Sequence, residues 1–374
     1  MKIKYLRIFK TVLLLATALP FLGAVPATAG EIKSGNQNQL TIYGIVTRAL
    51  LYADDGDRHQ LFNIDGGVEN TRIGWLARGQ LDKDLYVLGH IEMDAPLSNA
   101  AGDVNLNGTE SVIRASWGIR IQDITVTHRR FGSMSLGRGD TASTDRVATD
   151  LSGSDLATGN NPADMAGGIH FYNKTTGARS VTLGDVFDKV DGLDKASRIR
   201  YDLPEIGGLG VAVSMTGGGA TDIGAGYARE FGDFAFEAGA YYANSSGIST
   251  TDSGLWGGAG SLKHAGGLSL TVSGAIKGQK ASGRDDPNYL WGKIGYSTSL
   301  FKIGETHFGV SYGQYNDFSQ NGDEATSLGF GIVQDLEPIG SNLWLLVRNH
   351  KLDQAGSDNF DDVFIVSAGT LLNF

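Results

Sequence analysis

Residues 70–94 read NTRIGWLARGQLDKDLYVLGHIEMD, and apolar and polar side chains alternate through them on both sides of a short polar turn at 82–84. Before the turn, one face carries Ile73, Trp75, Ala77 and Leu81, and the other carries Arg72, Arg78 and Gln80. After the turn, Leu85, Val87, Ile91 and Met93 alternate with Tyr86, Leu88, His90, Glu92 and Asp94. A period of two predicts β strands with one apolar face.

The same period returns at 112–122, where Ile113, Ala115, Trp117, Ile119 and Ile121 alternate with Arg114, Ser116, Gly118, Arg120 and Gln122. Alternation alone also fits a soluble sandwich, in which the apolar faces meet in a dry core. Here the other face carries several charges with glycines between them, so it could border water. Aromatic residues lie near strand ends, as at Trp75, Tyr201, Trp256 and Tyr296. An apolar outside, a polar inside and aromatic girdles are typical of an outer-membrane barrel.

Composition supports an all-β chain and excludes several classes of function. The 374 residues include 54 glycines and only 7 prolines, which suits many strands with tight turns. A formal charge of -10 argues against a nucleic-acid partner. There is no cysteine, so neither disulfides nor thiolate chemistry can contribute.

The first 29 residues are typical of a cleaved signal peptide. Lys2, Lys4, Arg7 and Lys10 precede an apolar run to about Val25, and Ala27-Thr28-Ala29 forms a small-x-small cleavage pattern. We expect residues 1–29 to be removed, leaving a mature domain of 30–374. Loss of these four positive charges takes the formal charge from -10 to -14. No apolar run of membrane-helix length follows.

Short and long connections alternate along the rest of the chain. Short turns are expected near 82–84, 129–133, 204–208, 231–233, 264–267, 301–305 and 336–341. Longer polar stretches are expected near 54–69, 95–111, 139–193, 217–221, 245–254, 279–287, 317–325 and 353–361. Seven short and eight long connections join sixteen strands. A spanning sheet must close, because an open edge in lipid leaves backbone groups unpaired, so we expect the last strand to pair with the first, near 40–53.

Several patches resemble the general trimeric porins of Gram-negative bacteria. They are LTIYGIVTRALLY (40–52), residues 70–94, FGSMSLGRGD (131–140), SRIRYDLPEIGGLGVAVS (197–214) and the terminal phenylalanine. The resemblance implies a 16-stranded antiparallel transmembrane β-barrel in the bacterial outer membrane, with a long third loop folded into the lumen. It also implies a homotrimer, passive diffusion of ions and small hydrophilic solutes, contact with lipid and lipopolysaccharide, and Phe374 as a C-terminal signal for the barrel assembly machinery. The stretch 139–193 is longer than the family usually shows.

Charged side chains give the candidate constriction. Arg72 and Arg120 match the family's arginine cluster, and both face inward by parity. The other wall candidates are Arg114, on the face of Arg120, and Arg198 and Arg200, which alternate with apolar neighbours. The loop candidates are Asp140, Asp145, Asp150, Asp155 and Asp164. Arg138 shares the parity of Met134 and Leu136, so it faces inward only if its strand has already ended.

Two alternative functions remain open at this point: an outer-membrane barrel enzyme, and a secreted β-rich surface protein or adhesin. Residues 309–313 match G-x-S-x-G, but that motif needs a strand-to-helix turn, and here it lies inside an alternating strand. No cofactor is expected. The acids of 54–57 and Asp188, Asp191 and Asp194 could bind Ca²⁺ or bridge lipopolysaccharide phosphates, although solvated acidic loops are the favoured interpretation.

Overall fold

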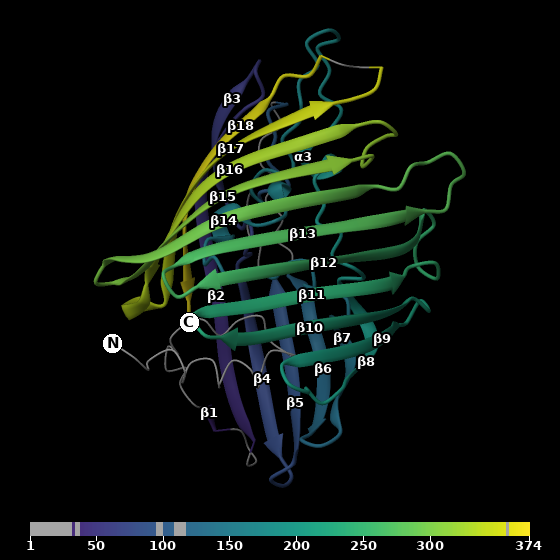
Figure 1. The fold of residues 1–374 in the computed structure, drawn as a ribbon, viewed down its shortest axis with the longest axis vertical. Coiled ribbons are helices and arrows are strands. Elements are labelled where there is room, and N and C mark those ends of the chain that lie inside the picture. The colour runs from purple at the N-terminus through teal and green to yellow at the C-terminus, as the bar shows by residue number, and fades with distance from the viewer. Residues whose placement is uncertain (1–31, 34–37, 95–99, 108–116, 357–358) are drawn as a thin grey trace.

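The computed structural model describes the chain apart from residues 1–31, 34–37, 95–99, 108–116 and 357–358 (Figure 1). The predicted signal peptide, 1–29, lies outside the described residues, and so does Arg114. Within the described part, no helix is long and apolar enough to cross a membrane.

The described residues form one antiparallel sheet that closes on itself. Its strands are β1 (Ile32–Lys33), β2 (Gln39–Asp54), β3 (His59–Ile64), β4 (Arg72–Gln80), β5 (Leu85–Asp94), β6 (Gly118–His128), β7 (Gly132–Asp140), β8 (Lys195–Asp202), β9 (Leu209–Thr216), β10 (Thr221–Phe231), β11 (Phe234–Asn244), β12 (Asp252–His264), β13 (Leu268–Gln279), β14 (Asn288–Phe301), β15 (Gly304–Asn316), β16 (Glu324–Leu336), β17 (Ser341–Asp353) and β18 (Val363–Asn373). β3 and β4 pair with successive parts of β2 and share one position, and β1 is a two-residue extension, so the barrel has 16 strand positions as predicted.

The last strand closes the barrel against the first. β18 pairs with β2 from Phe364↔Asp54 to Asn373↔Ile45, which confirms the predicted pairing. Closure leaves no open edge in hydrocarbon, where every unpaired backbone group would cost several kcal/mol.

The two faces of the sheet differ as the alternation predicted. In β8, Arg198 and Arg200 are buried on the inner face, whereas Ile199 and Tyr201 are exposed on the outer face. Other strands place large apolar side chains outside, among them Leu270, Val272, Leu290, Ile294, Val310 and Leu328. An apolar exterior of this kind fits hydrocarbon rather than water.

Two details differ from the sequence-based expectation. The first long connection, expected as a polar stretch over 54–69, contains β3, which pairs with β2. In β6, Ile119 and Ile121 pair with Met93 and Glu92, so the residue between them is the extra one of a β-bulge. Because a bulge shifts the alternation, Ile121 is buried and Gln122 is exposed, and the faces predicted for these two side chains were wrong.

The connection between β7 and β8, residues 141–194, is the longest, and we call it the inner segment. It contains α2 (Asp155–Thr158), the 3-10 helix η1 (Pro162–Met165) and α3 (Leu183–Val186); the only other helical turn described is η2 (Glu337–Ile339). In Figure 1 α3 is seen through the wall formed by β13 to β17. Apolar side chains of the inner segment pack against residues of the inner face. Phe187, directly after α3, packs against Tyr315 of β15 with 5.0 Å between ring centroids.

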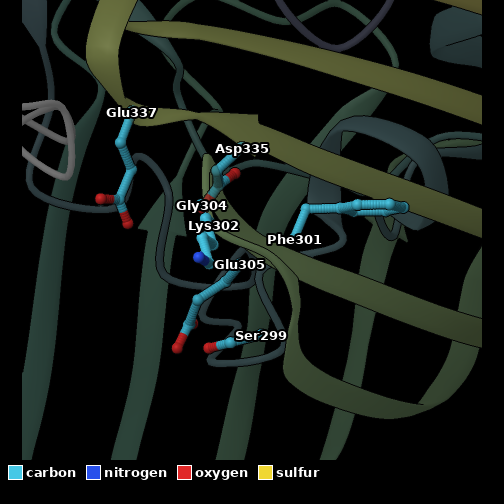
Figure 2. A pocket seen from close by; sticks show the side chains of 7 residues that line it. All are labelled: Ser299, Phe301, Lys302, Gly304, Glu305, Asp335 and Glu337. Atoms are coloured by element: carbon cyan, nitrogen blue, oxygen red, sulfur yellow. The ribbon is translucent and has the colours of Figure 1, made fainter.

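A hollow of about 380 Å³ opens at the end of the barrel that carries the short turns (Figure 2). Its lining side chains come from the ends of β14 to β16 and the turns beside them: Ser299, Phe301, Lys302, Glu305, Asp335 and Glu337. None of these residues belongs to the inner segment or to the candidate constriction.

Candidate functional site

The inner segment lies against the inner wall where the wall has glycines. A Cβ on Gly224 would be 1.9 Å from the carbonyl oxygen of Ala142, and one on Gly239 would be 2.4 Å from that of Arg146. The same crowding recurs at Gly295, Gly309 and Gly331 on β14, β15 and β16. At Gly224 and Gly239 the missing side chain makes room for the backbone of the inner segment, and at the other three glycines it makes room for small side chains of residues 152–158.

Polar side chains then fix the inner segment on that wall. Asp150 forms an ion pair with Lys293 of β14, whose side chain is 0% exposed. The Asn160 carbonyl accepts a hydrogen bond from Tyr315 of β15 at 2.8 Å, and its amide donates to Ser273 at 3.2 Å. A buried charge that lost its partner would be costly, so these contacts hold the segment in one position.

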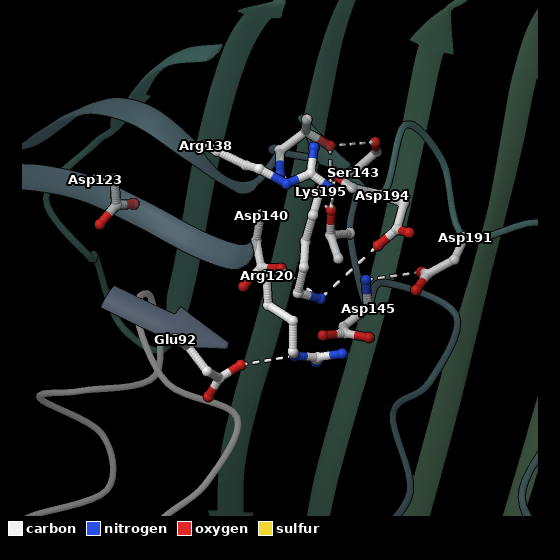
Figure 3. A network of polar contacts seen from close by, with 12 residues as sticks. Glu92, Arg120, Asp123, Arg138, Asp140, Ser143, Asp145, Asp191, Asp194 and Lys195 are labelled. Atoms are coloured by element: carbon white, nitrogen blue, oxygen red, sulfur yellow. Dashed lines mark hydrogen bonds and ion pairs between the residues drawn. The ribbon is translucent and has the colours of Figure 1, made fainter. Parts of the chain in front are cut away.

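The candidate wall arginines come from strands on the other side of the barrel, since β5 and β13 are half the closed sheet apart. Arg72 pairs with Glu69 at 2.7 Å and with Glu92 at 3.5 Å. Arg120 pairs with Glu92 at 2.7 Å and with Asp94 at 3.4 Å, and Figure 3 shows the contact with Glu92. The structure therefore brings the two predicted arginines together around a shared glutamate.

Arg198 and Arg200 have a different environment. Both are buried, and each pairs with an acid of the wall, Arg198 with Asp123 at 2.6 Å and Arg200 with Asp202 at 2.7 Å. Both also donate to backbone carbonyls where the inner segment begins, as Arg200 does to Thr141 at 2.9 Å. They hold the start of the segment.

The lumen side of the inner segment carries acids and one lysine. Lys189 pairs with Asp191 at 3.0 Å and lies 3.7 Å from Asp145. Asp155 is exposed, and Asp164 is half-buried and accepts a hydrogen bond from the Asn161 amide at 2.6 Å. Crowding by surrounding groups withdraws the Asp164 carboxyl from water and raises its pKa to about 7.

The remaining predicted residues differ in their surroundings, and of these Asp140 lies near the wall arginines through its partner Lys195. Arg138 lies within β7, is exposed on the face of Met134 and Leu136, and donates to the Ile119 carbonyl at 3.0 Å, so the structure does not group it with the other arginines. Asp140 pairs with Lys195 at 3.0 Å where the two strands end. Phe374 is 45% exposed on the outer face.

Sequence reasoning missed Glu69, Lys189 and Lys195 as charges of this region, and it named Asp191 only as a possible Ca²⁺ ligand. Lys189 and Asp191 lie in irregular backbone, where no period assigns a face to a side chain. Glu69 precedes β4 and is brought to Arg72 by the three-residue spacing between them. Glu92 could have been found, because its parity in the 85–94 alternation already placed it on the face of the charged residues.

The acidic stretches noted in the sequence are bound to cationic side chains of the chain itself. Asp55 and Asp57 both accept from Arg179, with 2.6 Å between Asp55 Oδ2 and the guanidinium, and Asp188 pairs with Lys277 at 3.0 Å. Across the part of the chain that the structure describes, no group of His, Asp and Glu side chains is arranged to hold a metal ion.

A closed sixteen-stranded barrel with an apolar exterior, a charged interior and a long inner segment defines a class, the outer-membrane diffusion channels. The family model of the Gram-negative porins matches residues 12–340, and the chain belongs to this family. No curated protein matches the sequence.

Solved structures agree on the fold. In-vitro folded OmpT, an outer membrane protein of Vibrio cholerae, is 15% identical with a TM-score of 0.59, and the match covers 92% of this chain and 100% of that one. The anion-selective porin from Comamonas acidovorans is 17% identical with a TM-score of 0.59, covering 90% and 100%. The outer membrane channel DcaP of Acinetobacter baumannii is 13% identical with a TM-score of 0.58, covering 92% and 99%. At these identities the likeness concerns the fold alone.

Proposed function

We propose that this outer-membrane channel is narrowest between the inner segment and the wall that bears Arg72 and Arg120. One observation carries the proposal: residues 142–160 lie against the inner faces of β10 to β17, so the segment takes up space on this side of the interior. The open cross-section is then bounded by the segment on one side and by the opposite wall on the other.

The physical action of such a gap is to sort solutes by size and hydration. Carboxylates on the segment and guanidinium groups on the wall set a field across a narrow aqueous gap, and rings of charged side chains set ion selectivity. Ions and small hydrophilic solutes keep enough hydration to pass. Large solutes do not fit through the gap, and apolar solutes do not interact favourably with its charged borders.

Passive diffusion requires no catalysis. Two arrangements in the chain resemble hydrolase sites, and in both the serine has a structural environment. Ser297, His307 and Asp335 follow one another at 2.9 Å and 3.1 Å in the order of a hydrolase triad. However, the Ser297 hydroxyl donates to the Ser152 carbonyl at 3.0 Å and so fastens the inner segment. Ser311 of the G-x-S-x-G match is buried within β15. The family, and the similar structures described as porins or channels, point to a non-enzymatic channel.

The family and the fold place the protein in the outer membrane. Residues 1–29 would direct export, and the terminal Phe374 would be read by the barrel assembly machinery. A homotrimer is the proposed assembly, supported by a similar OmpT structure that is described as a trimer form. Lipopolysaccharide would contact the outer rim.

Cell fractionation tests the location in the membrane, and a protein released without detergent would contradict it. Chemical cross-linking tests the trimer.

Liposome swelling tests the proposed function. Vesicles containing the purified barrel should swell in isotonic solutions of neutral sugars, at rates that fall steeply as the sugar grows. Vesicles without protein provide the baseline. Swelling at that baseline rate for every sugar would refute the channel.

A further inference from the structure

The charges that border the proposed constriction are not balanced. On the wall, Arg72 and Arg120 share three acids, Glu69, Glu92 and Asp94. Lys195 in turn lies between two acids, Asp140 at 3.0 Å and Asp194 at 3.8 Å. The wall cations are therefore outnumbered by the carboxylates that contact them.

On the inner segment, the cations are matched but the acids are not. Lys189 lies between Asp145 and Asp191. Arg146, the other cation near this pair, lies against Gly224 and Gly226 of β10, and its Nε donates to the carbonyl of Ala142 in the inner segment at 3.2 Å. These two cations offset those two acids.

Asp155 and Asp164 add negative charge that no paired cation offsets. Among the described residues, neither forms an ion pair. Arg348 of β17 is buried behind α2, with its Nη2 3.5 Å from the Ala157 carbonyl, and the charges of both acids act on it. The charges of Lys189 and Lys293 also reach these carboxyls, but each lysine already forms an ion pair with another acid, Asp191 or Asp150. One buried guanidinium faces two carboxyls, of which Asp155 is exposed and Asp164 half-buried on the lumen side.

We propose that the constriction prefers cations to anions, that Asp155 and Asp164 set this preference, and that small organic cations carrying an amine or guanidinium group pass faster than neutral solutes of equal size. The proposal rests on the proposed function, because it needs a water-filled gap bordered by the inner segment. A surplus of one sign in a narrow site with low-dielectric walls raises the local concentration of counter-ions.

Reversal potentials in a potassium chloride gradient at pH 8 test the proposal. The wild type should favour K⁺ over Cl⁻. Asp155→Asn and Asp164→Asn should each lower the permeability ratio by about twofold, as expected for one charge about 10 Å from an ion in a water-like dielectric. Arg120→Ala should raise the ratio, because it leaves Asp94 without its ion pair and Glu92 with Arg72 alone.

Asp285→Asn, in the exposed connection 280–287, is the matched control and should leave the ratio unchanged. Each variant is accepted only if its single-channel steps are as uniform as those of the wild type, which shows that the barrel has folded. An anion preference in the wild type, or an unchanged ratio in both asparagine variants, would overturn the inference while leaving the channel intact. Complete absence of ionic steps would instead refute the proposed function.

Discussion

Phe374 and Gly44 exchange two backbone hydrogen bonds, from Gly44 N–H to the Phe374 oxygen at 3.0 Å and from Phe374 N–H to the Gly44 oxygen at 3.1 Å. Phe374 therefore extends the closing pair of strands by one residue beyond Asn373. A Cβ on Gly44 would lie 2.4 Å from Cζ of the phenylalanine ring, so the ring covers the glycine on the outer face. Backbone pairing and ring contact therefore meet at one point of the closing strand pair.

Filling the space at Gly44 should weaken this closure. We expect Gly44→Val to displace the Phe374 ring and to lower the fraction of protein that migrates as a folded barrel in unheated detergent gels. Gly210→Ala in β9 is the control, because its Cβ meets nothing within 4 Å. Equal folded fractions for both variants and the wild type would show that the ring contact does not matter.

A methyl group at Gly239 should dislodge the inner segment. The new Cβ would lie 2.4 Å from the Arg146 oxygen and 3.1 Å from its Cα, and backbone atoms cannot move aside as a flexible side chain can. We expect Gly239→Ala to give larger and noisier single-channel currents. Gly260→Ala in β12, with its nearest contact at 3.9 Å, should behave like the wild type. Identical current traces for all three proteins would contradict the close contact.

Removing the charge of Lys293 should leave Asp150 of the inner segment unpaired where the segment meets β14. Such a loss commonly costs about 3–5 kcal/mol, whereas replacing both partners by apolar residues is often neutral. We expect Lys293→Met to release the segment and to lower the midpoint of thermal unfolding. The double variant Lys293→Met/Asp150→Leu should recover much of the loss. A double variant no better than the single one would argue against a specific ion pair.

Selectivity should depend on pH near neutrality. The pKa of Asp164 is raised to about 7, so its carboxyl is charged above that pH and neutral below it. The preference for K⁺ should therefore decline when reversal potentials are measured at pH 6 instead of pH 8. Asp164→Asn should remove this decline, because asparagine does not titrate. A decline of equal size in the variant would assign it to another group.

The alternation of residues predicted the barrel and the inward face of Arg198 and Arg200, because a period of two assigns each side chain of a strand to a face. It failed past Arg120, where the bulge inserts one residue and reverses the faces of Ile121 and Gln122. The residues that precede a bulge alternate normally, so the pattern does not predict where the bulge will occur. The short turns were predicted within a few residues because the polar stretches there are distinct. The first two long connections were not: 54–69 contains β3, and β6 begins at Gly118, while 112–116 of the expected strand lie outside the described residues.

The constriction was predicted less completely. Irregular backbone gives no parity, so the roles of Asp145, Asp150 and Lys189 could not be separated in the sequence. The structure separates them: Asp150 is buried against Lys293, whereas Asp145 and Lys189 border the lumen. The inner face of β17 also carries apolar Trp344 and Leu346, which are buried in one cluster with apolar residues of the inner segment, whereas a wall lined only by water was expected to be polar.

The central claim is that the inner segment borders the narrowest part of an open channel, and one measurement tests it most directly. The natural chain has no cysteine, so the single thiol of Asp155→Cys can be modified selectively with a bulky methanethiosulfonate reagent during planar-bilayer recording. The account predicts stepwise currents before modification and an abrupt fall in single-channel conductance afterwards, with no fall for Asp285→Cys. Currents that never appear, or that stay the same after complete modification at position 155, would contradict it.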